Sequence, residues 1–343
     1  MFRNPQRSRC SSRGHAETPL RCNLWRVTDA DSWTEEQALA SQISWRDLNA
    51  EFSNDQQWYH YTDIYGLKGI LDSGEIWLTH MAYLNDSQEF EYGIGVICDI
   101  IKYQADWFNQ NPEKTTSPES VEFVAELYRT MASGLASNAG FLKNAHAPFI
   151  ACLSRSRDQL SQWRGYANGG YAIAFDSELL KDSFAIVDES GATIPGHEKP
   201  RVAKANYLNY LVEEQVGKIV EARITDTTEA ITAKDDAKAE EAAQKFTDSV
   251  IEIVSTLKHQ KFFEEHEYRI ISRCRESFYT PSSLGLIPRA KTSYDKKAIQ
   301  EVIVGPGAFA ELRKASLERY FAERSDHFGD VAVTQSELPY REV

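Results

Sequence analysis

The chain has 343 residues, 42% of them hydrophobic and 26% charged, and its formal net charge at pH 7 is −13. This length can bury a core of domain size, while the acidic balance argues against a protein that coats duplex nucleic acid or anionic membrane. No apolar run approaches the roughly 20 residues of a transmembrane helix. The five cysteines form no CxxC pair. We therefore expect a cytoplasmic protein with reduced thiols, no metal site and no membrane partner.

Hydrophobic patterning predicts an α+β fold, a mixed or antiparallel sheet of six to eight strands flanked by helices. Residues 1–50 are polar and arginine-rich at first, which predicts a poorly ordered extension before a single domain at 51–343. A segment rich in Ala, Glu and Lys predicts a helical insertion at about 211–262. The expected elements are strands at 58–62, 75–79, 149–153, 171–175, 204–210, 268–272, 300–304 and 331–335, and helices at 63–73, about 86–108, 120–142 and 309–322.

The stretch 148–176 reads as strand, polar loop, short helix, glycine turn and strand. Asp158 is placed to cap the short helix. Trp163 lies among the apolar positions of that helix, so we expect its ring to be buried and to fix the helix on both strands. Arg164 falls on another face, where it could point toward carboxylates further along the chain. The loop carries Ser154 and Ser156, which are turn residues unless the loop lines a cleft.

The aromatic strand at 58–62 contains His60-Tyr61-Thr62. His60 and Thr62 lie on one face because strand side chains alternate. A histidine and a hydroxyl at this spacing can together hold a ribose diol or a phosphate. The simpler interpretation is a satisfied core histidine beside a strand threonine.

Two glutamates, Glu265 and Glu267, precede the strand at 268–272. Carboxylates on one face raise each other's pKa or divide the catalytic roles between them. A solvated acidic patch is the simpler interpretation. The pair Asn85-Asp86, with Glu89, is most simply a helix cap, and the alternative is a polar cluster that faces the same cleft.

Four motifs occur in one order along the chain, and together they resemble the bacterial domain of unknown function 2971 over about 58–309. The resemblance implies an accessory or defence protein of bacteria, and no particular activity. The motifs are His60-Tyr61-Thr62, then Asn85-Asp86 with Glu89, then Cys152-x-Ser154 with Trp163 and Tyr166, then Glu265-x-Glu267-Tyr268-Arg269.

The same order is also similar to the three motifs of ADP-ribosyltransferases, although the spacing from Ser156 to Glu265 is long and the helix with Trp163 is not part of that pattern. The resemblance implies NAD as co-substrate, Glu267 as the carboxylate that stabilises the oxocarbenium ribose, and Glu265 as the residue that helps to choose the acceptor. The implied NAD-binding residues are His60, Tyr61, Thr62, Ser154 and Ser156. The further cleft candidates are Asn85, Asp86, Glu89, Trp163, Arg164, Tyr166 and Arg269.

These patterns favour an ADP-ribosyltransferase-like effector of antiphage defence or of a toxin system, which uses NAD to modify a macromolecular target. We then expect His60, Ser154 and Glu267 to converge on one cleft. The alternative is a non-enzymatic module that senses a nucleotide or a protein. In that case the helical insertion would dock a protein partner or a second copy.

Overall fold

A computed structural model describes most of the chain after residue 55. The contacts divide the chain into Met1–Asn54 and Asp55–Val343, and the predicted extension at 1–50 and the predicted cap at Asn85 and Asp86 lie outside the described residues. The described residues are 56–84, 88–111, 118–207, 212–213, 215–220, 222–223, 226, 234–275 and 278–339.

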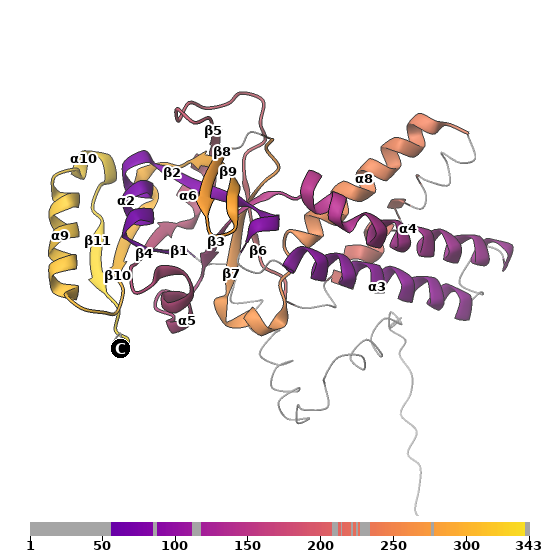
Figure 1. The fold of residues 1–343 in the computed structure, drawn as a ribbon, viewed down its shortest axis with the longest axis horizontal. Coiled ribbons are helices and arrows are strands. Elements are labelled where there is room, and N and C mark those ends of the chain that lie inside the picture. Colours follow the sequence, from indigo (N-terminus) through magenta and orange to yellow (C-terminus); the bar gives the residue numbers. More distant parts are fainter. Residues whose placement is uncertain are drawn as a thin grey trace, which may run out of the picture. The chain divides into compact units, whose positions relative to one another are not determined.

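A mixed sheet of eleven strands organises this part of the chain (Figure 1), which confirms the α+β prediction. The strands are β1 (Gln57–Thr62), β2 (Glu75–His80), β3 (Phe149–Ser154), β4 (Tyr171–Asp176), β5 (Ala185–Val187), β6 (Arg201–Lys204), β7 (Glu267–Ser272), β8 (Phe278–Ser282), β9 (Gly285–Ser293), β10 (Ile299–Val304) and β11 (Ala332–Gln335). The main path is β11-β10-β4-β1-β3-β2-β9-β5; β7 pairs with β3, β6 with β7 and β8 with β9. The β10–β11 pair is parallel, and the other strand pairs are antiparallel.

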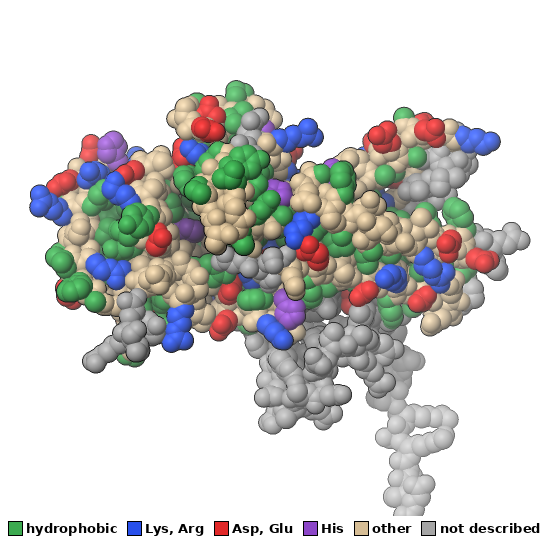
Figure 2. All heavy atoms as spheres, viewed as in Figure 1, with side chains coloured by type: hydrophobic (Ala, Val, Ile, Leu, Met, Phe, Trp, Pro, Cys, Tyr) green, Lys and Arg blue, Asp and Glu red, His purple; other side chains and the backbone are tan. Residues whose placement is uncertain are grey.

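The predicted count of six to eight strands was too low, chiefly because the β8–β9 hairpin was missed. Its strands contain Pro281 and Gly285, residue types that are depleted in strands and weaken the pattern. Hydrophobic side chains gather over this hairpin in Figure 2, where Tyr279, Leu284 and Leu286 are exposed. The hairpin is therefore a real part of the sheet with an apolar outer surface.

Helices cover both faces of the sheet. The helices are α2 (Ile64–Ser73), α3 (Glu89–Gln110), α4 (Pro118–Ala145), α5 (Leu160–Gln162), α6 (Ser177–Ser183), α8 (Asp236–Val254), α9 (Ala310–Ala322) and α10 (Ser325–Phe328), with 3-10 turns at Met81–Tyr83, Gln260–Glu265 and Lys296–Ala298. The predicted bounds of α2 hold. Asp63 accepts a hydrogen bond from the Gly66 N–H at 2.7 Å, and Gly74 ends the helix with a φ of 69°.

Alternation along the central strands separates two apolar cores. On β3, Phe149, Ala151 and Leu153 belong to the core that holds α2, α6 and α9. Ile150 faces the other core, which holds α3, α4 and α8. Because successive strand residues point to opposite faces, the sheet lies between the two helical layers.

The predicted helical insertion at about 211–262 is represented by helical residues at 212–213, 215–220, 222–223 and 226, by α8 and by the 3-10 turn after it. The apolar face of α8 is buried against α3, and a Cβ built on Gly93 of α3 would lie 3.1 Å from Val254. The helix therefore completes a core of its own chain.

The central unit has the predicted order: β3, the short helix α5, a π-helical turn at Trp163–Ala167 and β4. Trp163 is 1% exposed, and its ring meets Tyr61 edge to face with centroids 4.7 Å apart. The predicted cap was wrong. Gln159 occupies the N-cap without a side-chain bond, because the Asp158 carboxylate accepts instead from Trp163 Nε1 and Ser336 Oγ, both at 2.6 Å.

Candidate functional site

Register brings the strands of three predicted motifs together at one point of the sheet. Ser154, the last residue of β3, is the pairing partner of Tyr59 on β1. On its other side the same Ser154 pairs with Glu267, the first residue of β7. Directly opposed residues share a face, so the serine loop and the second glutamate border one site.

Glu267 lies at the centre of a buried cluster of charges. It contacts Lys258 Nζ through Oε2, and Arg269 Nε lies 2.7 Å from its Oε1. The Arg269 guanidinium is fully buried and also reaches Glu89 Oε2 at 2.7 Å, while its Nη1 donates to the Ser255 carbonyl at 3.0 Å. Buried charges persist where they are paired and hydrogen-bonded in this way.

Lys258 contacts both the buried carboxylates of the cluster and Glu265, which is the more exposed carboxylate. Its Nζ lies 2.9 Å from Glu265 Oε2 and 3.3 Å from Glu89 Oε1. The Glu265 side chain is 12% exposed, against 3% for the side chains of Glu89 and Glu267. Three carboxylates and two cations leave one net negative charge, and Glu265 is the carboxylate of the three that reaches solvent.

Two partly exposed aromatic rings flank the Glu265 edge. The Tyr166 hydroxyl donates to the Glu265 carboxylate at 3.3 Å, and Lys258 Nζ lies 5.1 Å from the centroid of the Phe262 ring. Both rings are 37% exposed. The edge therefore offers a carboxylate, a phenol and an apolar ring to an approaching molecule.

The pKa values of Glu267 and Glu265 are shifted in opposite directions. Burial alone would raise the pKa of Glu267, but Arg269 and Lys258 outweigh it and lower the pKa to about 2. Burial raises the pKa of Glu265, although Lys258 opposes that shift. Glu267 is thus held ionised, while the pKa of Glu265 is shifted in the other direction, above its ordinary value.

Ser154 and Ser156 take part in hydrogen bonds to backbone groups that stabilise this site. Ser154 Oγ donates to the Glu265 carbonyl at 2.8 Å and accepts from the Ser156 N–H at 3.0 Å. The Tyr61 hydroxyl donates to the Ser156 carbonyl at 2.6 Å. The serine loop therefore fixes the turn that carries Glu265, and the hydrogen bond from Tyr61 fixes the loop itself.

The comparisons with known proteins bear on this same region. The comparison with curated proteins and the comparison with solved structures each found no match. A family model did match. Residues 162–270 match "Protein of unknown function (DUF2971)".

The DUF2971 match begins at the last residue of α5 in the central unit and ends inside β7. The matched segment contains these residues of the site: Tyr166, Lys258, Glu265, Glu267 and Arg269. This match supports the resemblance expected from the sequence. Glu89, Ser154 and His60 precede the matched segment, so the cluster joins DUF2971 residues to residues from earlier strands and helices.

The register does not bring His60 to Glu267. His60 follows Tyr59, the partner of Ser154, and therefore points to the opposite face of the sheet. Its Nδ1 lies 3.0 Å from the Cys152 carbonyl, and burial lowers its pKa. The expected convergence of His60, Ser154 and Glu267 on one cleft was wrong in this respect.

Thr62 lies on the same face as His60 and packs against the first turn of α2, where a Cβ on Gly66 would lie 2.0 Å from Thr62 Oγ1. The roles of His60 and Thr62 in holding NAD stay a prediction, and they apply to a face that Glu265 and Glu267 do not share.

The remaining candidates divide between the cluster and the surface. Glu89 is buried in the cluster, although sequence reasoning favoured a simple cap there. Arg164 is exposed, and Lys258 and Arg269, rather than Arg164, pair with Glu267.

Lys258 and Tyr207 are the members of the site that sequence reasoning missed. The Tyr207 hydroxyl accepts the Glu267 N–H at 3.0 Å. Tyr207 lies within the strand expected at 204–210 and Lys258 within the predicted helical insertion, and neither is part of a motif. A lysine just after an apolar helix end, nine residues before a buried glutamate, is the one local signal for Lys258.

Within the part of the chain that the structure describes, no group of three or more His, Cys, Asp or Glu side chains is placed to hold a metal ion. Over the same residues, every helix is too short or too polar to span a bilayer.

Proposed function

We propose that this chain is an NAD-dependent ADP-ribosyltransferase-like effector that modifies a macromolecular target from the Glu265 edge of the cluster. The observation that carries the proposal is the register at Ser154, where the strands of the three motifs lie side by side. Fold and order alone do not define chemistry, so the proposal also depends on what the side chains can do.

The transfer needs an anionic group beside the ribose carbon at which positive charge develops. In the proposed step, the bond between that carbon and the nicotinamide nitrogen breaks, and its electron pair neutralises the pyridinium. A nucleophile of the target forms the new bond to the same carbon and loses its proton to the solvent or to a carboxylate.

Glu265 is the carboxylate suited to meet the substrate, because it lies at the accessible edge beside the Tyr166 hydroxyl. Glu267, expected from the sequence to be catalytic, is enclosed by two cations and suits a positioning role: it holds Lys258, which in turn holds Glu265. The proposal therefore exchanges the roles that the resemblance gives to the two glutamates.

The test measures nicotinamide release and label transfer. Purified protein is incubated with NAD labelled in its adenylate phosphate, with and without a bacterial lysate as the source of acceptors. We expect Glu265→Gln to lower the rate about 100-fold or more, as for loss of a main electrostatic group. Glu264→Gln is the matched control, since Glu264 is exposed and adjacent. A wild-type protein that neither releases nicotinamide nor labels any target would refute the proposal.

A non-enzymatic nucleotide sensor is the second candidate, favoured by the enclosure of Glu267 and Arg269, which are 2% and 0% exposed. A cluster closed in this way can serve structure alone. Thermal shifts with NAD and ADP-ribose separate the two, because a ligand at 100 times its Kd stabilises the folded state by about 2.7 kcal/mol. A thermal shift without turnover would identify the sensor.

A further inference from the structure

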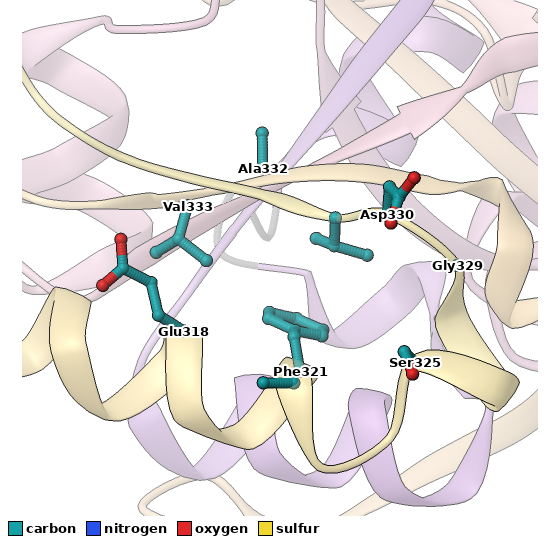
Figure 3. Close-up of a pocket in the computed structure, with 9 residues that line it drawn as sticks. Glu318, Phe321, Ser325, Gly329, Asp330, Ala332 and Val333 are labelled. Atoms are coloured by element: carbon teal, nitrogen blue, oxygen red, sulfur yellow. The ribbon is translucent and has the colours of Figure 1, made fainter.

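A groove separates the edge strand β11 from the helix α9 (Figure 3), and none of the residues that line it belongs to the charged cluster. Its volume is about 450 Å³, within the range of sites that enclose a side chain or a small ligand. Its apolar wall is formed by Phe321 of α9, by Val333 of β11 and by Val331, which directly precedes β11. The groove thus offers an apolar recess at the outer border of the sheet.

The backbone of β11 is open toward this border. In the described residues β11 pairs with β10 alone. The Ser336 N–H donates to the Val304 carbonyl of β10 at 2.9 Å. Since backbone groups alternate sides along a strand, Thr334 also faces β10, while Val331 and Val333 direct their N–H and C=O groups outward. An added strand would find these groups ready to pair.

The charged residues that line the groove are acidic. They are Glu318 and Asp330, and no Lys or Arg lines it. Lys314, one turn earlier on α9, has its Nζ 3.8 Å from Glu318 Oε1. In Figure 3 the Glu318 carboxylate stands at one end of the opening beside Val333, and Asp330 marks the other end. An occupant that carries cations on an apolar stem would match both the wall and the rim, because such stems pack on apolar surface while the charge stays at the mouth.

We propose that β11 and α9 form a docking groove for an extended, basic peptide segment of a partner protein. The segment pairs with the outer edge of β11 as an added strand. One of its Lys or Arg side chains enters the recess over Phe321 and meets Glu318. This docking site is independent of the proposed transferase chemistry, because none of its residues belongs to the charged cluster.

The test uses the full chain and a fluorescein-labelled probe, acetyl-Val-Lys-Val-Lys-Val-amide, in a fluorescence anisotropy titration at low salt. We expect saturable binding with a Kd below 1 mM, and about fivefold weaker binding to Glu318→Gln, which corresponds to the loss of one favourable surface ion pair. Glu311→Gln is the matched control, an exposed glutamate on the same helix outside the groove, and should bind like the wild type.

Three outcomes would overturn the proposal. The first is no binding of the lysine probe by the wild-type chain at 1 mM protein. The second is equal binding of a probe with glutamate in place of lysine, which would remove the role of charge. The third is equal binding of N-acetyl-lysine amide, which would show a site for a small cation rather than for an extended segment.

Discussion

Replacing Lys258 with methionine removes one ammonium from among three carboxylates and keeps an unbranched side chain of similar length. The Lys258 side chain is 5% exposed, and its Nζ reaches Glu265 at 2.9 Å and Glu89 at 3.3 Å in addition to Glu267. In Lys258→Met, Arg269 remains as the partner of Glu89 and Glu267, and Glu265 keeps the Tyr166 hydroxyl. Two of the three carboxylates then lack a full counter-charge.

The expected loss of stability at pH 8 is about 3–5 kcal/mol, the usual cost of leaving buried charge without its partner. For a domain of this size each kcal/mol lowers the melting temperature by roughly 2–4 °C. We therefore expect Lys258→Met to melt about 10 °C below the wild type in circular dichroism. Lys261→Met is the control, because Lys261 is exposed three residues away, and it should melt like the wild type.

The deficit of Lys258→Met should shrink as the pH falls from 8 to 5.5. Burial already raises the pKa of Glu265 while Lys258 is present, and removing Lys258 raises it further. A group whose folded pKa lies above its unfolded value gives the folded state an extra proton at lower pH, which stabilises that state. A deficit under 1 kcal/mol, or one that does not change with pH, would refute the view that Lys258 neutralises the cluster.

Three further predictions concern single groups. Trp163→Ala should cost about 3–5 kcal/mol in urea unfolding, because the ring is fully enclosed and packs on Tyr61, and a variant as stable as the parent would show that this helix is not fixed by the ring. Arg164→Ala should stay within about 0.5 kcal/mol of the wild type in the same experiment, since Arg164 is exposed, and a larger loss would contradict that placement. The pKa of Glu267 is lowered to about 2, so its contribution to stability should be present above pH ~4.5 and be lost as the pH falls toward 2; acid titration followed by circular dichroism checks this, and an unchanged melting temperature across that range would contradict it.

Local signals predicted those parts of the fold that local physics determines. Asp63 and Gly74 mark the ends of α2, because a cap and a left-handed residue act within one turn. The β8–β9 hairpin was missed because Pro281 and Gly285 weaken the strand pattern, while pairing with β2 along β9 stabilises the hairpin from a distant part of the chain. In the region of the strand expected at 204–210, β6 lies at Arg201–Lys204 and pairs with β7, while 208–210 are outside the described residues.

From the sequence, only those site residues could be predicted that belong to a recognisable motif. Glu265 and Glu267 were found from their spacing, and both do contact Lys258. The face of His60 depended on the register between β1 and β3, which no short pattern encodes. Lys258 pairs with Glu89, a residue far away in sequence. Only the folded chain therefore shows that the lysine is buried among carboxylates.

The direction of the Tyr166 side chain depends on the number of residues in the π-helical turn at Trp163–Ala167, rather than on which residues they are. Its closing bond runs from the Asn168 N–H to the Trp163 carbonyl, one residue further than in an α-helix. Deleting Gly165 would restore an ordinary turn and rotate Tyr166 by about 100° relative to Trp163, while every side chain that touches Glu265 would still be encoded. A chain that lacked one residue here would therefore carry the same side chains around Glu265 and orient Tyr166 differently.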